Sequence, residues 1–413
     1  MFLLVFNFHN NSHSPGGKEK RLGHHQSHQA DKFDYYQQHY YPRSHSVTFE
    51  IEGQVHQLNL TQSFREVFSS ETWIWEVSSN HGQSLQPIYK EASRAEINLE
   101  GDFYVDNKQK AVVLVYNEQT GPVLSFDGVV GEGERRKIII SRSNNDRIKR
   151  KTKLPNVVQK IPRCKNLEQI HDYRDIVKKI KLELDKIDVV LDILYPKLLV
   201  VVDYHLFKDL NKDLKKTVEY VATYWNIVDQ KYSSLESPKV QIVITGLIIA
   251  TDERALNFIY KHRVGPDHID QKLLLKETAT YFSKKFSSHL NFENYNAVFV
   301  MTGLAMKNKG LFFEELGLTF KDSGICSNDR NIAIVSDNGQ FASTLVAAHE
   351  LGHLLKLEHD YAKACHGPLH TLPTVMSMPS NSADIFWSEC SKNTLRNFSR
   401  SMAAKCLASR SKI

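Results

Sequence analysis

The sequence predicts an α/β fold class, with a β-rich N-terminal part followed by a larger part of alternating strands and helices. Short runs that alternate apolar and polar residues, separated by Gly and Asn/Asp turns, fill residues 46–140. After residue 195, continuous apolar runs typical of buried parallel strands alternate with amphipathic helical patterns. The length of 413 residues and the apolar share of 41% suit a globular chain of two or three domains.

The second part has a strand and a helix pattern in nearly every segment. We expect buried strands at 198–202, 240–249, 297–301 and 332–335. We expect helices at 212–231, 268–286, 341–355 and 388–402. Strands separated by helices of this length predict a largely parallel sheet with helices packed on its faces.

Charge and hydropathy exclude two classes of partner. The net charge of +6 is spread over 53 cationic and 47 anionic side chains, which gives no nucleic-acid signal. No run of apolar residues is long enough for a membrane-spanning helix, so we expect no membrane span.

Three segments are not expected to belong to a folded core: residues 1–8, residues 9–46 and the linker 141–163. Residues 1–8 are apolar and short, and we interpret them as a signal-like segment, with a random apolar N-terminus as the alternative. Residues 9–46 are rich in His, Gln, Ser and Tyr, which predicts a disordered tail; loose metal binding by its histidines is the alternative. Residues 141–163 form a polar, basic linker, and the order Arg147-Ile148-Lys149-Arg150 also suits a proprotein convertase.

Five cysteines are too few for a disulfide-dense mini-protein, and their odd count is informative. Cys164 stands alone, and the other four lie near the C-terminus: Cys326, Cys365, Cys390 and Cys406. Two bridges plus one thiol with a separate role would imply an oxidising compartment, whereas five reduced thiols would imply a cytosolic protein. In a secreted protein, Asn10, Asn59 and Asn397 would be N-glycosylation acceptors.

The chemistry lies in His349-Glu350-Leu351-Gly352-His353 and in His359-Asp360. On a helix, positions i and i+4 share one face, so both imidazoles of the first motif can reach one metal ion. A third histidine completes three neutral ligands and leaves one tetrahedral position open, as at a catalytic zinc. An exposed helix with unrelated histidines is the alternative, but the apolar neighbours indicate a buried helix, where unpartnered histidines would be costly.

These residue types suit hydrolysis of a peptide bond. Zinc lowers the pKa of a bound water towards about 7, so a hydroxide-like nucleophile exists at neutral pH. Glu350 projects from the same helical turn and would accept the water proton, then pass it to the leaving amine. The metal would stabilise the developing oxyanion.

The pattern His349-Glu350-x-x-His353, with His359-Asp360 six residues on, resembles the zinc signature of the metzincins in their reprolysin (adamalysin, ADAM) branch. Thr374-Val375-Met376 is similar to that family's Met-turn. The resemblance implies a metzincin catalytic domain: a mostly parallel twisted sheet with an antiparallel edge strand, an active-site helix, and a small C-terminal subdomain. A β-rich propeptide would precede it, so the expected units are 1–45, 46–194 and 195–413.

The resemblance also implies details of individual residues. It pairs Cys326 with Cys406 and Cys365 with Cys390, and it makes Cys164 a cysteine switch that keeps a zymogen silent. The segment around Gly324-Ile325-Cys326 leads into an edge strand that pairs with an extended substrate.

Some positions depart from the family. Lys197 and Asn296 stand where the family has acidic calcium ligands, so we do not predict calcium. Val375 stands where a further cysteine often precedes the Met. Lys356 stands where the family has a glycine at positive φ, at a cost of about 1 kcal/mol.

Together these features predict a secreted zinc metalloendopeptidase made as a latent zymogen. We expect one catalytic Zn²⁺, protein substrates, the chain's own propeptide as a partner, and a monomer. The short form is similar to venom metalloproteases, which implies a toxin role. Since the basic run ends before Cys164, activation could use a later site such as Lys178-Lys179. The alternatives are a catalytically silent metzincin-fold binding protein and a cytosolic zinc hydrolase with reduced cysteines.

Overall fold

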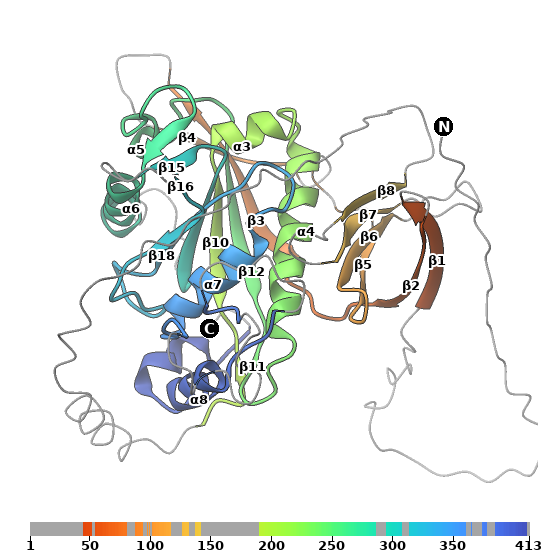
Figure 1. Ribbon diagram of the computed structural model, residues 1–413. Helices are drawn as coiled ribbons and strands as arrows, with labels where there is room; N and C mark the ends of the chain where they lie inside the picture. The colour runs from red at the N-terminus through yellow and green to blue at the C-terminus, as the bar shows by residue number, and fades with distance from the viewer. Residues whose placement is uncertain are drawn as a thin grey trace, which may run out of the picture.

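The fold is seen in a computed structural model (Figure 1). It describes residues 44–51, 54–80, 87–93, 97, 99, 101–116, 126–131, 137–141, 190–285, 295–307, 314–360, 365, 374–377 and 385–410. No helix among these residues is long and apolar enough to cross a membrane.

The N-terminal part contains the strands that the sequence predicted there. Within the described residues, one antiparallel sheet has six strands in the order β1-β2-β5-β6-β7-β8. Its strands are β1 (Ser44–Ile51), β2 (Gln54–Gln62), β5 (Gly101–Asp106), β6 (Ala111–Tyr116), β7 (Phe126–Val130) and β8 (Lys137–Ser141). Alternate apolar side chains on one face of this sheet form a small core of their own around Leu58, Leu60 and Val113.

A second sheet forms the centre of the molecule. In the described part of the chain its order is β17-β18-β14-β10-β12-β3-β4. The strands are β3 (Phe68–Ser79), β4 (Pro87–Glu91), β10 (Lys197–Val202), β12 (Val243–Ala250), β14 (Ala297–Thr302), β17 (Gly317–Thr319) and β18 (Ile332–Ser336). Only the outermost pairs, β17·β18 and β3·β4, are antiparallel among these. The mostly parallel sheet with an antiparallel edge strand is therefore present.

The sequence did not predict that β3 and β4 would leave the N-terminal sheet and join this one. The two short sheets of the described residues are β9 (Ile193–Leu194) with β11 (Lys239–Val240), and β13 (His268–Asp270) with β15 (Ala305–Lys307) and β16 (Glu314–Glu315). The helices are α3 (Tyr204–Asp209), α4 (Leu214–Tyr232), α5 (Asn257–Tyr260), α6 (Gln271–Thr280), α7 (Thr344–Leu354) and α8 (Glu389–Phe398), with a π-helical turn η2 (Tyr281–Lys285) and a 3-10 helix η5 (Met402–Leu407).

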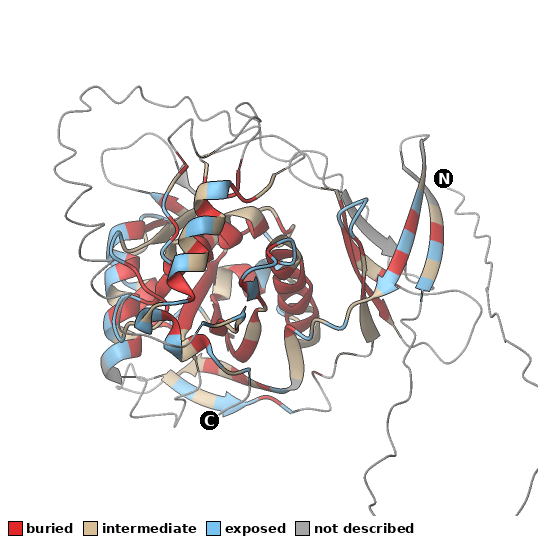
Figure 2. Cartoon of the chain, turned by 90° about the horizontal axis from the view of Figure 1, so that it is seen from below, coloured by how far each residue is buried: buried red, intermediate tan, exposed pale blue. Residues whose placement is uncertain are grey.

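Helix α4 lies between the two large sheets, and α5 and α6 cover the other side of the central sheet (Figure 1). Because α4 has a sheet on either side, it is buried around most of its circumference (Figure 2). Tyr224, Trp225 and Tyr232 are fully buried. Asp213 begins this helix by accepting a hydrogen bond from the Lys216 backbone N–H at 3.1 Å. The core of the second half thus forms on both faces of the central sheet.

Helix α7 begins three residues later than the sequence pattern indicated. Phe341 has a positive φ of 60°, so the helix cannot start there. Instead, the carboxylate of Asp337 accepts hydrogen bonds from the backbone N–H (3.0 Å) and Oγ (2.7 Å) of Ser343, just before the first helical residue. Tyr232 of α4 donates from its hydroxyl to the Ala348 carbonyl at 2.7 Å. These contacts fix α7 against α4 and the sheet.

Candidate metal centre

Helix α7 presents two histidines on one face, and a third follows the helix. His349 and His353 are one turn apart on α7, and His359 lies in the segment that leaves it. Nε2 of His359 lies 3.0 Å from Nε2 of His349 and 3.1 Å from Nε2 of His353. The three candidate ligand atoms all lie within 4.8 Å of one another. The structure therefore brings together the three residues that the sequence indicated.

The backbone fixes which ring nitrogen faces this point. Nδ1 of His349 lies 2.7 Å from the Val375 carbonyl oxygen, and Nδ1 of His353 lies 2.8 Å from the Leu357 carbonyl oxygen. A carbonyl oxygen can only accept, so each Nδ1 carries the hydrogen and donates it. Each Nε2 is then left with a lone pair, which is the tautomer that binds a metal through Nε2.

Burial keeps the three rings neutral. Burial first, and then the neighbouring His353, lower the pKa of His349 from 6.5 to about 3. Burial also lowers the pKa of His353 and the pKa of His359. Neutral imidazole is the form that binds a metal, so the site needs to lose no proton at neutral pH.

The donor set fits a zinc ion. Nε2 of His349 and Nε2 of His353 each have a lone pair and no hydrogen. His359 is the only one of the three rings that could donate to them, and its Nε2 could donate to only one, so at least one lone pair has no donor among these rings. Two Zn–N bonds of about 2.0–2.1 Å at a tetrahedral angle put their nitrogens about 3.3 Å apart. The observed separations of 3.0 and 3.1 Å are close to this value. His349, His353 and His359 would hold the ion and leave one position open.

The turn after α7 places the third histidine next to the first two. Lys356 has a φ of +69°. Its N–H donates to the His353 carbonyl, and the Leu357 N–H donates to the Gly352 carbonyl, each at 2.9 Å. These two bonds are those of a Schellman motif, which usually has glycine at this position. The Lys356 ammonium also donates to the Ser323 carbonyl, so the lysine makes a contact that a glycine could not.

Glu350 lies beside the edge strand β17. The residue is only 6% exposed. A Cβ built on Gly317 would lie 2.7 Å from Glu350 Oε1 and would also overlap the Val346 side chain. The backbone of β17 can approach α7 this closely only because residue 317 has no side chain. The carboxylate is therefore placed next to the strand edge at which an extended chain could pair.

Met376 lies directly under α7. It is fully buried. A Cβ on Gly352 would lie 2.6 Å from its Sδ, so the glycine of the histidine motif gives the methionine its place. The backbone around Met376 also reaches the site, because the Val375 carbonyl accepts from His349.

Asp360 is hydrogen-bonded to three other residues of this region. Its carboxylate accepts from Thr374 Oγ1 at 2.6 Å and from Ser388 Oγ at 2.7 Å. Its own N–H donates to the Met376 carbonyl at 3.0 Å. Sequence reasoning used Asp360 only as part of a motif and missed Thr374 and Ser388 as its partners. No local pattern around those two residues signals such a role.

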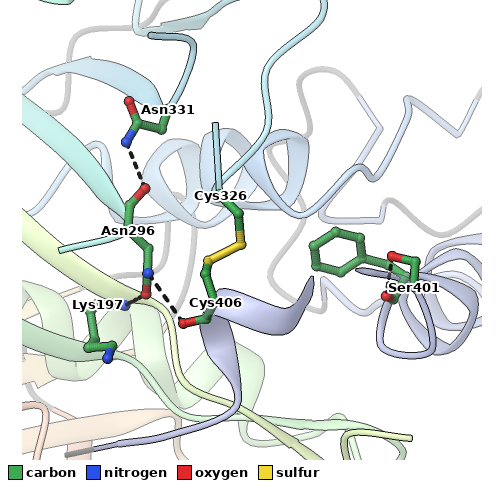
Figure 3. Close-up of a disulfide and its surroundings, with 7 residues drawn as sticks. Lys197, Asn296, Cys326, Asn331, Ser401 and Cys406 are labelled. Carbon is green, nitrogen blue, oxygen red and sulfur yellow. Dashed lines mark hydrogen bonds between the residues drawn. A yellow bond between two sulfur atoms is a disulfide. The ribbon is translucent and has the colours of Figure 1, made fainter. Parts of the chain in front are cut away.

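Two disulfides close the C-terminal region. Cys326 is bonded to Cys406, and Cys365 to Cys390, so both pairings implied by the resemblance are confirmed. Close to the first bridge, the Lys197 N–H donates to Asn296 Oδ1 at 3.0 Å. Asn296 Nδ2 donates to the Cys406 carbonyl at 3.3 Å (Figure 3).

Several predicted features lie outside the described residues. They are the candidate switch Cys164, the basic linker, the Lys178-Lys179 pair and the N-terminal tail before residue 44. The switch and the processing sites therefore stay predictions.

The comparisons with known proteins point to one family. The chain is 40% identical to Venom metalloproteinase 2 of Eulophus pennicornis over 178 residues, covering 43% of this chain and 42% of that protein. It is 28% identical to Venom metalloproteinase 3 of the same organism over 379 residues, covering 87% of this chain and 86% of that protein. For Venom metalloproteinase 1 the identity is 28% over 209 residues, covering 49% of this chain and 46% of that protein. The chain thus spans less than half of the length of two of these relatives.

Residues 194–410 match the reprolysin (M12B) family of zinc metalloproteases. The match covers more than half of the chain and includes α7, the three histidines and both disulfides. The metzincin α/β fold of this part agrees with it. The chain belongs to the reprolysin family.

Proposed function

We propose that the chain is a secreted zinc metalloendopeptidase that cleaves peptide bonds in proteins. The observation that carries this proposal is the convergence of three neutral imidazole nitrogens. Two of these histidines lie on the buried helix α7 together with Glu350, and His359 follows the helix, so the chain has the residue types that peptide hydrolysis needs.

The chain's own residues would perform the proton transfers. Bound zinc would supply a Lewis acid that polarises the scissile carbonyl and makes water more acidic. Glu350 would take a proton from the water as its oxygen attacks the carbonyl carbon, and would give that proton to the amine nitrogen as the C–N bond breaks. The edge of β17 would hold the substrate as an added strand, so that its backbone runs past Glu350.

Latency and secretion are part of the same proposal. The two disulfides favour an oxidising compartment, and relatives of this chain are named venom metalloproteinases. Residues 46–194 would be the propeptide, Cys164 would occupy the open zinc position in the zymogen, and the mature protein would act in venom as a monomer. No calcium is assigned beside Lys197 and Asn296.

The alternative is a silent binding protein with the same fold, whose only support in the sequence is Lys356 and the order of the processing sites. The Schellman hydrogen bonds at this residue are intact, so the turn accommodates the lysine. No observation in the described residues therefore favours the alternative over the enzyme.

One assay set tests the proposal. The chain is expressed, its N-terminal part is cut from the catalytic part, and zinc content and cleavage of a denatured protein substrate are measured. We expect Glu350→Ala to keep zinc but lose about 10²–10⁴-fold in kcat, and chelation to abolish cleavage until zinc is restored. Glu236→Ala, which removes an exposed glutamate after α4, is the matched control. If wild type cleaves no better than Glu350→Ala while both hold zinc, the binding-protein alternative is correct.

A further inference from the structure

The strand β3 belongs by sequence to the N-terminal unit, by which we mean the described residues within 44–141. In space it is an inner strand of the central sheet (Figure 1). It runs parallel to β12, with residues 73–77 opposite residues 246–250. The ladder continues at its start, where the Ile244 N–H donates to the Val67 carbonyl at 2.8 Å.

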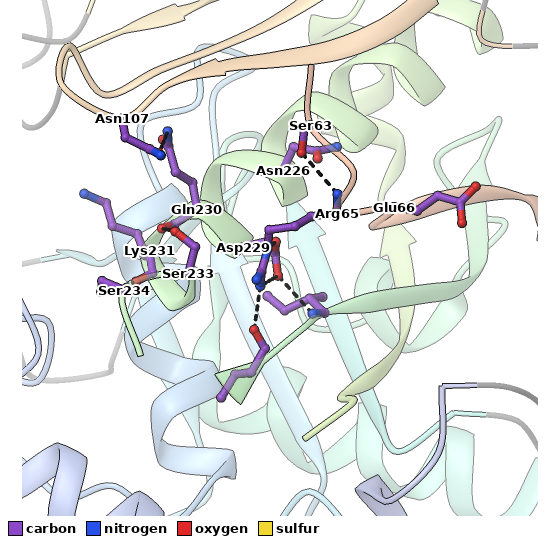
Figure 4. A network of polar contacts seen from close by, with 12 residues as sticks. Ser63, Arg65, Glu66, Asn107, Asn226, Asp229, Gln230, Lys231, Ser233 and Ser234 are labelled. Atoms are coloured by element: carbon purple, nitrogen blue, oxygen red, sulfur yellow. Dashed lines mark hydrogen bonds and ion pairs between the residues drawn. The ribbon is translucent and has the colours of Figure 1, made fainter. Parts of the chain in front are cut away.

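An ion pair with a buried carboxylate fixes the start of β3. Arg65 binds both carboxylate oxygens of Asp229 on α4, with Nη2 to Oδ1 at 2.8 Å, and also donates to the Val240 carbonyl (Figure 4). The Asp229 side chain is only 2% exposed, and it also accepts from the Ile242 N–H at 2.9 Å. A carboxylate of the catalytic part is thus neutralised by an arginine of the N-terminal unit. Removing one partner of such a pair leaves an uncompensated buried charge.

Further hydrogen bonds join the two parts along β3 and β4. Thr72 Oγ1 donates to the Ile244 carbonyl at 2.8 Å in a buried position. At the far end of the strand, the Ser79 N–H donates to the Asp252 carboxylate. The hydroxyl groups of Tyr89 on β4 and Tyr281 on η2 are also hydrogen-bonded to each other. The contact therefore extends over the whole length of the strand.

Apolar side chains of β3 enter the core on both faces of the central sheet. Ile74 belongs to the same buried cluster as Trp225 of α4. Val77, which is fully buried, belongs to the cluster on the opposite face, with Ile248 of β12 and Val201 of β10. Successive residues of a strand point to opposite faces, so one strand can complete both layers. Without it, the apolar strand β12 would present an open edge and two uncovered core surfaces to water.

We infer that the N-terminal unit is a permanent structural subunit of the protease. When the chain is cut between β8 and β9, the two parts stay together as a noncovalent complex held by β3. This unit sits at the opposite end of the sheet from β17, the strand beside Glu350. Its retention therefore leaves the active-site edge in place.

The inference rests on the proposed processing of the chain, but it can be tested without catalysis. A recognition site for an unrelated, sequence-specific protease is placed between residues 142 and 189 of the Glu350→Ala chain, which is then cut completely. In native buffer at nanomolar dilution, we expect both fragments to co-elute in size-exclusion chromatography. Recovery of free N-terminal fragment, whether the catalytic fragment stays soluble or precipitates, would overturn the inference. With Glu350 present and the proposed switch removed by Cys164→Ala, an intact but inactive complex would count against the proposed function alone.

Two variants test whether β3 is the attachment. Arg65→Ala should raise the dissociation constant of the cut fragments at least tenfold, because Asp229 loses its arginine. Lys90→Ala removes an exposed ion pair with Glu76 inside the N-terminal unit. It should change the dissociation constant of the cut fragments less than twofold. Equal effects of the two variants would contradict the assigned interface.

Discussion

The two ends of the central sheet differ in whether the outer strand of the catalytic part is paired on its outer side. At one end, β17 is a strand of three half-buried residues that ends the sheet among the described residues and lies against Glu350. At the other end, the edge of β12 is covered by β3, and β4 is the outermost strand; both come from more than 150 residues earlier in the chain. An exposed edge invites pairing with any extended chain. Among the described residues, the catalytic part thus has an unpaired edge at β17 next to Glu350, the proposed general base, and a paired edge at β12.

The largest expected effect concerns the covered end. Val77→Ala removes two methyl groups from a fully buried position and should lower the free energy of unfolding by about 2–3 kcal/mol. Ile88→Ala on β4, where the side chain is 49% exposed, is the matched control and should cost under about 0.5 kcal/mol. Urea unfolding followed by tryptophan fluorescence measures both. Equal costs would mean that β3 does not complete the core.

The next effect concerns the open end. Gly317→Ala should force β17 away from Glu350, because the new Cβ would meet Oε1 at 2.7 Å. Displacements of about 1 Å near the reacting groups can lower kcat by 10- to 100-fold. Zinc content and circular dichroism should stay unchanged. A variant with wild-type kcat would show that the close approach of strand and carboxylate is not needed.

The stability of the metal-free protein should fall at acidic pH. The pKa of His349 is about 3 in the fold and 6.5 when exposed, so between these values the unfolded chain binds the extra proton. Stability therefore falls as the pH drops below 6.5, by about 1.4 kcal/mol at about pH 5.5 for this ring. Unfolding of chelator-treated protein at neutral pH and at about pH 5.5 measures it. His349→Asn should have a shallower pH dependence; an unchanged slope would refute the assignment to this ring.

The smallest effect concerns the turn beside the open end. Lys356→Ala keeps a residue at positive φ but loses the bond to Ser323, and should cost about 1 kcal/mol. Lys356→Gly loses the same bond but relieves the backbone strain of order 1 kcal/mol, so its stability should lie near wild type. Thermal unfolding of the three proteins compares them. If Lys356→Gly were less stable than Lys356→Ala, the backbone strain from the positive φ of residue 356 would be negligible.

The inner strands and the active-site helix could be predicted well from the sequence, but the edge strand could not. The segment around residues 324–326 was expected to lead into the edge strand; it leads into β18, which is an inner strand, and the edge strand is β17, which precedes it. The apolar runs at β10, β12, β14 and β18 permit little besides buried strands, and the histidine spacing on α7 is a local property. The disulfide pairing came from the family resemblance, since four cysteines allow three pairings.

The covered end could not be predicted. The alternation at 73–77 fits any half-buried strand, and nothing in it indicates a parallel partner some 170 residues later. The ion pair of Arg65 with Asp229 and the partners of Asp360 depend on the same kind of long-range contact. Local patterns predict elements, while these contacts exist only after the chain has folded.

The carboxylate of Asp360 couples the third histidine to two other segments of the chain. It stands next to the third histidine and is bound to Thr374 beneath the helix and to Ser388 at the start of α8. A displacement of Thr374 or of the start of α8 would therefore also shift the backbone next to His359. The position of this ring depends in this way on two segments that are distant from it in the sequence.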